Sequence, residues 1–469
     1  MTDRLESGHA PLDEVLGGGL PAHAISLITG LPGTGKTILA QQYMFQNARS
    51  DRPGIYFSTV SEPLEKMLRF GQSLDFFDRA EVGRSVFYED LGQEVNQHGL
   101  SGVLDQIGAL LKERRPGIMV IDSFKALHAY AASEGEFRQF LHELAARLTA
   151  FPVASLWVGE YEDSAIGSLA EFAVADAILD LRTAQTGQRE TRFVRVRKLR
   201  GSGFRAGAHA YRLGPGGVHV FPRLADLRVQ SEYPLRHVRL SSGIAALDEM
   251  VGDGYWPGAT TLVAGPSGSG KTIMGLHFIF AGAQQGEPGV IASLQENPTQ
   301  LQRLAAGLEW SLHEPDVELM YRSPVDIYLD EWVYDLLKAV ERTGARRVLV
   351  DSLSDLKIAA PDETRFREFM YSLSQRFSLQ GVSMLMTLEI ADIYGAERLS
   401  DFGVSHLSDN VVMLSRYEDQ SMLKRSATVI KTRASGHDPS VRQFEIGPRG
   451  IKLGGPAPPR EGWAASFGG

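Results

Sequence analysis

The chain contains no cysteine among its 469 residues, which excludes disulfide bonds, cysteine-ligated zinc and thiol catalysis. Long apolar runs are missing too, since no segment approaches the ~18 residues that a membrane-spanning helix needs. The first residues, Met1 to Glu6, are polar and acidic and lack the pattern of a secretory signal peptide. We therefore expect a cytoplasmic protein with no membrane partner.

Positive charge is in short supply. Lys and Arg number 48 against 57 Asp and Glu, which gives a formal net charge of −9. This balance argues against a protein whose whole surface binds nucleic acid or anionic lipid, because such binding depends on basic residues. Apolar residues make up 43% of the chain, and its length is enough for two large domains or three small ones.

Two phosphate-binding loops are present, Gly30–Thr37 and Gly265–Thr272, and both match the pattern G-x-x-x-x-G-K-[ST]. Each follows an apolar strand and precedes an apolar helix, whose dipole adds positive charge under the phosphates. Glycines let backbone N–H groups point at phosphate oxygens, the lysine reaches the β- and γ-phosphates, and the threonine hydroxyl suits Mg²⁺. The predicted nucleotide-binding residues are Gly30, Gly33, Thr34, Gly35, Lys36, Thr37, Gly265, Ser267, Gly268, Ser269, Gly270, Lys271 and Thr272.

Each half also has an apolar strand that ends in an aspartate, Asp122 in the first and Asp351 in the second. An aspartate there can be a simple turn residue. Downstream of a phosphate loop, however, the pattern is that of a Walker B element, whose carboxylate reaches a Mg²⁺ shell at the carboxyl edge of a parallel sheet. We therefore predict ATP and Mg²⁺ as cofactors, with Thr37, Asp122, Thr272 and Asp351 at the metal site.

The two halves repeat one another. The opening Ser7–Glu14 corresponds to Ser242–Glu249, and the same offset of 235 positions separates Lys36 from Lys271. An amphipathic helix is predicted from residue 100 to 114 in the first half. Near its end, each half has a strand that alternates basic and apolar residues, followed by a turn. Such a strand is either a solvated basic face or a contact for phosphate.

The paired openings, the basic turn Lys198–Gly201 and its counterpart Lys431–Arg433 resemble the KaiC family of tandem ATPases. The resemblance covers roughly residues 5 to 453. It implies an α/β fold of two tandem RecA-like P-loop NTPase domains, each a mostly parallel twisted sheet flanked by helices. The domains are expected at residues 1–228 and 229–455, with a flexible C-terminal tail at 456–469.

The resemblance also implies a homohexameric ring of two tiers, with ATP bound at subunit boundaries. In the family, the basic turns project into the nucleotide of the neighbouring subunit. The residues expected to act across the boundary are Arg192, Lys198, Leu199, Arg200, Ser202, Arg425, Lys431, Thr432, Arg433, Ser435 and His437. A KaiB-like or signalling protein is implied as a partner, in a role in timing or signalling, and no nucleic acid is expected.

In the family, two adjacent glutamates follow the second strand, and at these positions the present sequence differs. Here the first half has Val60 and Ser61, with Glu62 one place later, and the second half has Gln295 and Glu296. The first half is therefore expected to bind ATP mainly to hold the ring, and the second to hydrolyse ATP slowly. The catalytic residues are predicted to be Glu296, Lys271, Asp351 and Arg433.

The family's second domain also carries a Ser-Thr pair that becomes phosphorylated. Ser405 and His406 stand at these positions, with Ser408 close by, whereas the first half has Phe172 and Ala173. Autophosphorylation is therefore expected at Ser405 or, failing that, at Ser408.

Two other functions stay open. A RecA-class DNA-acting ATPase would bind single-stranded DNA in a salt-dependent manner, although the acidic balance and the lack of a basic-aromatic stretch argue against it. A nucleotide-gated scaffold would bind ATP with little catalysis, and its function would lie in the partner that it binds.

Overall fold

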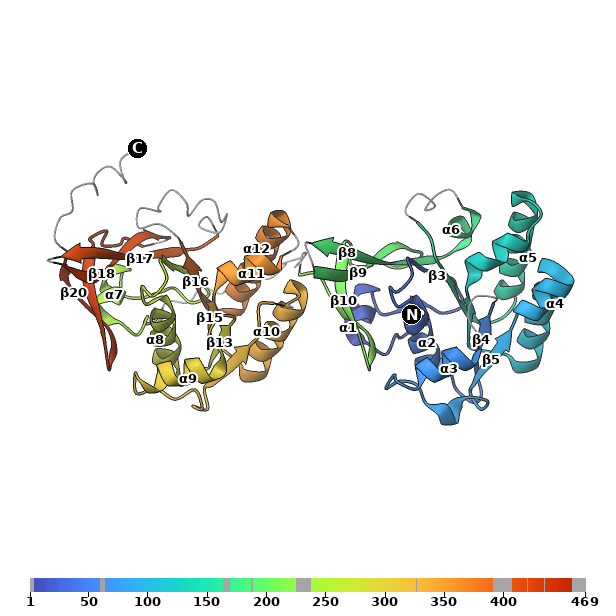
Figure 1. Ribbon diagram of the computed structural model, residues 1–469, viewed down its shortest axis with the longest axis horizontal. Coiled ribbons are helices and arrows are strands. Elements are labelled where there is room, and N and C mark those ends of the chain that lie inside the picture. The colour runs from blue at the N-terminus through green and yellow to red at the C-terminus, as the bar shows by residue number, and fades with distance from the viewer. Residues whose placement is uncertain are drawn as a thin grey trace. The chain divides into compact units, whose positions relative to one another are not determined.

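The structure is a computed structural model that describes residues 4–59, 64–162, 169–186, 189–224, 238–325, 327–360, 362–390, 407–419, 421–433 and 435–457 (Figure 1). The chain divides into two compact units, Met1–Arg223 and Leu224–Gly469. Among the described helices, none combines the length and the apolar character that crossing a bilayer requires.

The first unit alternates strands and helices along the chain. Its strands are β1 Arg4–Leu5, β2 Leu20–Pro21, β3 Ile25–Gly30, β4 Gly54–Ser58, β5 Val86–Asp90, β6 Ile118–Asp122, β7 Ala154–Gly159, β8 Ala177–Thr186, β9 Arg189–Leu199, β10 Ala208–Gly214 and β11 Gly217–Phe221. Its helices are α1 Ala10–Val15, α2 Lys36–Asn47, α3 Leu64–Gly71, α4 Gly92–Arg114, α5 Glu134–Thr149 and α6 Ala170–Val174, with 3₁₀ turns η1 Arg79–Glu81 and η2 Phe124–Tyr130.

Nine of these strands form one sheet in the order β11-β10-β9-β8-β3-β7-β6-β4-β5, counted over the described residues. The pairings from β5 across to β8 are parallel, and those from β8 to β11 are antiparallel. The remaining strands, β1 and β2, pair with each other. The strand that leads into the phosphate loop, β3, thus lies in the middle of the sheet, where both of its edges are paired.

The second unit repeats this plan. Its strands are β12 Thr260–Gly265, β13 Gly289–Ser293, β14 Val317–Tyr321, β15 Arg347–Asp351, β16 Ser383–Glu389, β17 Asn410–Asp419, β18 Met422–Thr432, β19 Arg442–Gly447 and β20 Gly450–Pro456. Its helices are α7 Ala245–Met250, α8 Lys271–Ala283, α9 Pro298–Ala306, α10 Leu329–Thr343, α11 Leu353–Ala359 and α12 Glu363–Gln380. Read from the corresponding edge, the strand order is β20-β19-β18-β17-β12-β16-β15-β13-β14, which matches that of the first sheet position by position.

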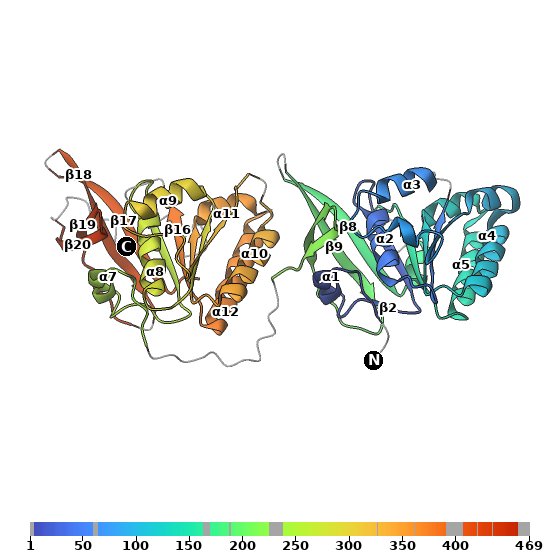
Figure 2. The ribbon, with the colours of Figure 1, turned by 90° about the horizontal axis from the view of Figure 1, so that it is seen from below.

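Helices cover both faces of each sheet (Figure 2). Leu27 and Ile28 are neighbours on β3 and point to opposite faces, because side chains alternate along a strand. Leu27 packs in the core beneath α4 and α5, whereas Ile28 packs in the core beneath α1 and α2. Both residues are fully buried. The central strand β3 is therefore buried along its whole length, as expected for a parallel sheet that is covered on both sides.

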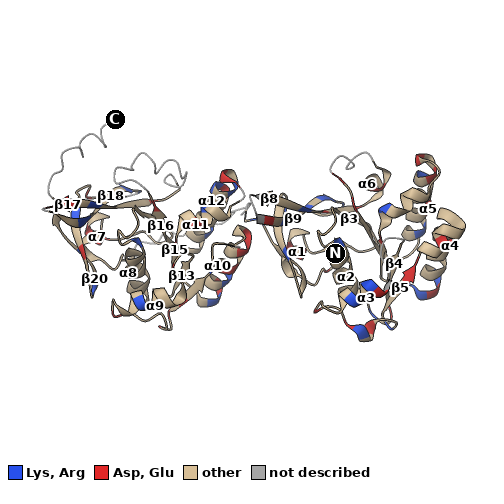
Figure 3. Cartoon of the chain, viewed as in Figure 1, with Lys and Arg blue, Asp and Glu red and all other residues tan. Residues whose placement is uncertain are grey.

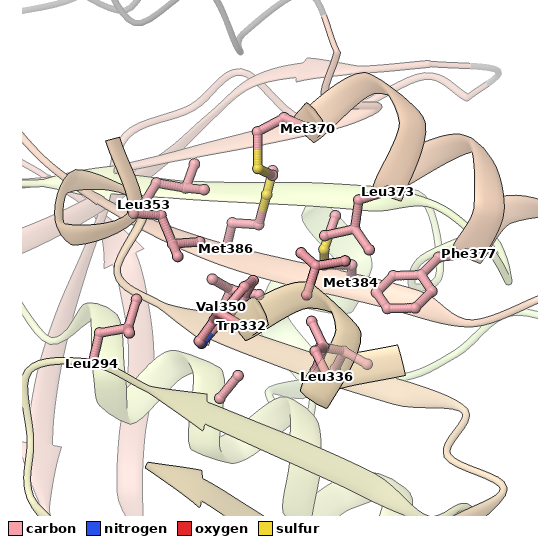
Figure 4. Close-up of a cluster of buried hydrophobic side chains, with 14 of the residues drawn as sticks. Leu294, Trp332, Leu336, Val350, Leu353, Met370, Leu373, Phe377, Met384 and Met386 are labelled. Atoms are coloured by element: carbon pink, nitrogen blue, oxygen red, sulfur yellow. The ribbon is translucent and has the colours of Figure 1, made fainter. Parts of the chain in front are cut away.

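One core of the second unit lies between its sheet and helices α10 and α12 (Figure 4). Val350 and Met386 from the strands meet Trp332 and Leu336 of α10 and Leu373 of α12. Each of these side chains is at most 1% exposed. Truncating a buried aromatic such as Trp332 to alanine typically costs about 3–5 kcal/mol of stability. This packing holds the end of β15, the position of the Walker B aspartate.

A side chain from the helix after each phosphate loop holds the outermost strand of its sheet. In the first unit, Gln42 Oε1 accepts the backbone N–H of Val218 at 2.8 Å. In the second unit, His277 Nε2 accepts the backbone N–H of Ile451 at the same distance. Burial lowers the pKa of His277 to about 4. The two units thus make the same contact, but only the second makes it with a group that can be protonated.

The helix predicted over residues 100–114 is confirmed as the second segment of helix α4. Helix α4 begins at Gly92, and Gly99, with φ of +62°, interrupts the helical geometry just before the predicted start. This is a conformation that glycine adopts far more readily than other residues. The apolar periodicity restarts after that kink, which is why the sequence pattern showed only the second segment.

Candidate functional site

Each phosphate loop joins the carboxyl end of a central strand to a helix: the first connects β3 to α2, and the second connects β12 to α8. The residue before each helix, Gly35 or Gly270, has φ of +85° or +106°, where a side chain would be strained. Thr34 is buried and its hydroxyl donates to the Leu31 carbonyl at 2.8 Å. Ser269, its counterpart, is fully buried and its hydroxyl has no hydrogen-bond partner.

The loop lysines fold over their own loops. Lys36 Nζ lies 2.8 Å from the Leu31 carbonyl and 3.8 Å from a carboxylate oxygen of Glu160. Lys271 Nζ lies 3.0 Å from the Gly265 carbonyl. Burial lowers the pKa of both lysines, and nearby carboxylates oppose that shift. Both ammonium groups are therefore held at the concave side of the loop, where a triphosphate would lie.

The predicted metal-site residues meet in the same way in both halves. The Thr37 hydroxyl donates to Asp122 Oδ2 at 2.7 Å, and the Thr272 hydroxyl donates to Asp351 Oδ2 at 2.7 Å. Within the described ranges, no group of three or more His, Asp and Glu side chains gathers as a metal site. One hydroxyl and one carboxylate fit Mg²⁺, which usually completes its shell with water and substrate phosphates. When bound, Mg²⁺ neutralises charge on the β- and γ-phosphates.

The two aspartates have different further partners. In the first half, the Tyr56 hydroxyl from β4 donates to Asp122 Oδ2 at 2.6 Å. In the second half, the Thr387 hydroxyl from β16 donates to Asp351 Oδ1. Burial raises the pKa of Asp351, and the hydrogen bonds from Thr387 and Thr272 oppose that rise. These partners had not been predicted, since the sequence gives no sign that hydroxyls on different strands serve equivalent aspartates.

A cavity of about 720 Å³ opens beside the first phosphate loop. Loop residues, Asp122 and an unpredicted acid, Glu160, all line it. Glu160 lies 38 positions after Asp122, and Glu389 lies 38 positions after Asp351. The repeat could therefore have revealed this pair of acids, because each follows the apolar strand next to its Walker B strand.

The second half has an additional cation beside its phosphate loop. A Cβ added at Gly268 would collide with the guanidinium of Arg416, which comes from β17. Arg416 lies directly across from Arg425 on β18, and the buried Nε atom of each has no hydrogen-bond partner. Like charges placed opposite each other destabilise a strand pair, so this arrangement favours an anion. The first-half counterpart of Arg416 is Thr183.

The first basic turn lies at the other end of the sheet. Leu199, the last residue of β9, pairs with Ala177, which in turn pairs with Ser26 near the start of β3. Asp176 fixes the turn, since one of its carboxylate oxygens accepts the Ile25 N–H at 3.1 Å and the other lies 3.1 Å from Arg200. At about 3.3 Å per residue, β3 separates this turn from its own phosphate loop by roughly 17 Å.

The second half repeats these contacts. An Asp409 oxygen accepts the Thr260 N–H at 2.9 Å, and Arg433 lies 3.6 Å from the other oxygen. Lys431 donates to the Ser408 carbonyl at 2.8 Å. In the first half, Lys198 donates to the carbonyls of residues 172 and 173. Burial lowers the pKa of both lysines.

The opening motif of each half supports this turn. A Cβ at Gly17 would collide with the Gly203 carbonyl, and a Cβ at Gly252 would reach 3.0 Å from the Gly436 carbonyl. Backbone N–H groups just beyond the two turns donate to carbonyls at the ends of α1 and α7. The opening motif and the basic turn, which are the two most specific parts of the repeat, are therefore one structural unit.

The residues predicted to act across a subunit boundary fall into two groups. Arg192 pairs across β8 with Thr183, beyond the end of β3, so it lies on the side of its own phosphate loop, as Arg425 does. The rest belong to the basic turns at the opposite edge. Of these, Leu199 is buried, the Ser202 hydroxyl donates to the next carbonyl, the Thr432 hydroxyl donates to the Ser435 carbonyl at 2.8 Å, and His437 lies 3.4 Å from Thr432.

The remaining predicted residues follow β13 or precede β17. Glu296 is half-buried, and its carbonyl accepts the Ser293 hydroxyl at 2.8 Å. Ser408 is fully buried. Ser405 and His406 lie outside the described residues, as do residues 60–62 of the first half.

In each half, a phosphate loop at the carboxyl edge of a largely parallel sheet, with a Walker B aspartate on a nearby strand, defines a RecA-type P-loop NTPase. A family model described as "ATPase: KaiC" matches residues 5–225 and 240–457. The chain belongs to this KaiC family of ATPases, and nucleotide binding is a property of that family.

Curated relatives extend over most of the chain. "Circadian clock oscillator protein KaiC 1" of Synechocystis sp. is 28% identical over 92% of this chain and 86% of its own length. "Circadian clock protein KaiC3" of the same organism is 28% identical over 97% of this chain and 92% of its own. "Circadian clock oscillator protein KaiC" of Rippkaea orientalis is 27% identical over 93% of this chain and 86% of its own.

Proposed function

We propose that this protein is an ATPase that assembles into a hexameric ring, binds ATP between subunits and hydrolyses it slowly, in a timing or signalling role. The names of its relatives support that role, since they describe circadian clock proteins. Mg²⁺ is the proposed metal, held by the threonine and aspartate of each site. The partner would be a KaiB-like or signalling protein.

The observation that carries the ring is the position of the basic turns. Arg200 and Arg433 lie at the amino edge of sheets whose phosphate loops lie at the carboxyl edge. Neither can therefore reach the nucleotide of its own domain. Phosphoryl transfer gains from positive charge that the loop lacks, and a neighbouring subunit can supply it. An interface in which one edge of a subunit meets the other edge of the next is of the type that closes rings.

Hydrolysis is proposed for the second half on the strength of Glu296, which follows β13 at the carboxyl edge of the sheet. Lys271 and Asp351 bind the phosphates and the metal, and Arg433 of a neighbouring subunit stabilises the charge that develops on the γ-phosphate. A duplex- or strand-binding function gains no support from charge, because acidic and basic residues are mixed on α3, α4, α5 and α10 (Figure 3).

Serine autophosphorylation is proposed for the second half, at Ser405. The alternative acceptor, Ser408, is fully buried and would need local opening before its hydroxyl could approach a γ-phosphate. Incubation with γ-labelled ATP and peptide mapping would test this. Label in the first half, or label that survives Ser405→Ala combined with Ser408→Ala, would contradict the assignment.

Light scattering after size exclusion, with and without ATP, tests the ring. We expect hexamers with ATP, and we expect Arg200→Ala to weaken them more than Lys36→Arg, because the first removes a contact between subunits and the second keeps the charge in the loop. A chain that stays monomeric with saturating ATP at micromolar concentration would contradict the ring. If the wild type binds ATP without turning it over, so that Lys271→Ala has no turnover to remove, the result would favour the scaffold function.

A further inference from the structure

A carboxylate that the family's glutamate pair does not include lies beside the phosphate loop in both halves. Glu160 directly follows β7, and Glu389 ends β16, the matching strand of the second sheet. Each stands next to the strand that leads into the phosphate loop, and each follows its Walker B aspartate by 38 positions. The acids are therefore equivalent parts of the two sites.

The strand register fixes where these acids lie. Glu389 pairs with Gly265, the first residue of the second phosphate loop, and the Ile390 N–H donates to the carbonyl of Gly265 at 3.3 Å. That same carbonyl accepts a hydrogen bond from Lys271. Glu389 thus lies against the base of the loop, beside the lysine that reaches the β- and γ-phosphates.

The first half has the same arrangement. Thr29 pairs with Gly159, which places Glu160 beside the first residue of its loop. The neighbours of Glu160 are fixed, since Gly159 and Tyr161 are both buried and pack against each other. The Glu160 side chain itself is 55% exposed, lines the cavity and lies 3.8 Å from Lys36.

Asp122, Asp351, Glu62 and Glu296 differ from this pair in their contacts or in their positions along the sequence. The aspartates are bound by threonine and by tyrosine or a second threonine, as a metal ligand should be. Glu62 stands one place after the positions of the family's glutamate pair, Val60 and Ser61, and lies outside the described residues. Glu296 has no counterpart at the matching position of the first half.

We propose that Glu160 and Glu389 orient the water that attacks the γ-phosphate, which gives both halves a carboxylate for hydrolysis. The inference rests on the proposed ATPase function and extends turnover to the first half. The water oxygen forms a bond to the γ-phosphorus while the bond to the bridging oxygen breaks. ADP leaves with that electron pair, and the water proton passes to the carboxylate and then to solvent.

The test uses the full chain and separates turnover from binding. Glu160→Gln is made together with Lys271→Ala, so that phosphate release reports on the first half, and affinity is measured with a fluorescent ATP analogue. We expect phosphate release at saturating ATP to fall by ~10²-fold or more. Affinity should stay the same or rise, because a negative charge beside the triphosphate is removed. Glu160→Asp should restore part of the turnover.

The matched control is Glu162→Gln, which removes the same charge from an exposed acid two residues further on. It should leave turnover unchanged. The double variant Glu160→Gln with Glu389→Gln keeps both loop lysines and should lose turnover while still assembling with ATP in light scattering.

Three results would overturn the inference while leaving the ATPase function intact. The first is turnover in the wild type but none in Lys271→Ala alone, which would make the first half inactive. The second is unchanged turnover in the double glutamine variant. The third is weaker ATP binding with unchanged turnover at saturation in Glu160→Gln, which would mean that Glu160 only positions Lys36. A wild type that binds ATP without any turnover would instead overturn the proposed function itself.

Discussion

Replacing Arg416 by threonine, the residue at the matching first-half position, is expected to weaken ATP binding by the second half. The Arg416 guanidinium lies against Gly268 of the loop, and Arg416 lowers the pKa of Lys271 after the larger effect of burial. Both observations place its positive charge beside the phosphate loop and its lysine. The threonine variant removes that charge, and it also relieves the repulsion with Arg425 across the strand pair.

The size of the effect follows from the kind of contact. A hydrogen bond to a charged group contributes about 1.5–3 kcal/mol. Arg416 is half-buried, so solvent screens part of this interaction and the lower value is appropriate. About 1.5 kcal/mol corresponds to a roughly tenfold increase in Kd.

The assay is equilibrium binding of a fluorescent ATP analogue in a Lys36→Ala background, which leaves the second site as the main one measured. Raising the salt concentration should shrink the difference between Arg416→Thr and the parent, because the contact is electrostatic. The reciprocal variant, Thr183→Arg with Lys271→Ala, should strengthen binding by the first half. An unchanged Kd for Arg416→Thr at low salt would refute a contact between this arginine and the nucleotide.

Three further outcomes are expected. His277→Gln, which copies Gln42 of the first half, should reduce the loss of stability of the second unit in acid. Burial lowers the pKa of His277 from 6.5 to about 4, so the folded state loses up to about 3 kcal/mol of stability as the pH falls through that window. Urea unfolding at several pH values measures this loss. In a Lys36→Ala background, where phosphate release reports on the second half, Glu296→Gln should reduce it by ~10²–10⁴-fold, whereas Glu62→Gln should change the turnover of the otherwise unaltered chain little. Thr387→Val should weaken Mg²⁺-dependent ATP binding in thermal-shift titrations, because the buried aspartate loses a hydrogen-bond donor worth about 1.5–3 kcal/mol.

The sequence predicted the tandem α/β architecture, and the structure and the family match confirm it. That success has a physical basis, because a glycine-rich loop between an apolar strand and a helix has few other structural solutions. The predicted partners Thr37 with Asp122, and Thr272 with Asp351, do meet in the structure. Their roles with Mg²⁺ stay predictions.

What the sequence could not supply were contacts between elements that lie far apart along the chain. Tyr56 and Thr387 serve equivalent aspartates from different strands, and Arg416 approaches its loop from β17. Such contacts depend on strand order, which a local pattern does not contain. Arg192, predicted to act with the basic turn, is held by β9 at the other end of the sheet.

The two halves have kept one set of contacts and changed another. At the amino edge, the aspartate that clamps the basic turn, the lysine that caps neighbouring carbonyls and the glycine that supports the turn recur in both sheets. At the carboxyl edge, the donor to the Walker B aspartate, the residue across from Gly268 and the acids after the second strand all differ. The amino-edge contacts are those we propose to join subunits.

In the proposed ring, a contact that joins subunits must fit the same surface of every neighbour. Contacts around the nucleotide are not constrained in that way, since each tier can tune its own affinity and rate. The duplicated turns therefore favour a ring in which both halves assemble alike. The differences around the two loops favour two nucleotide sites of unequal affinity for ATP. We expect the higher affinity in the second half, where Arg416 adds a positive charge beside the loop.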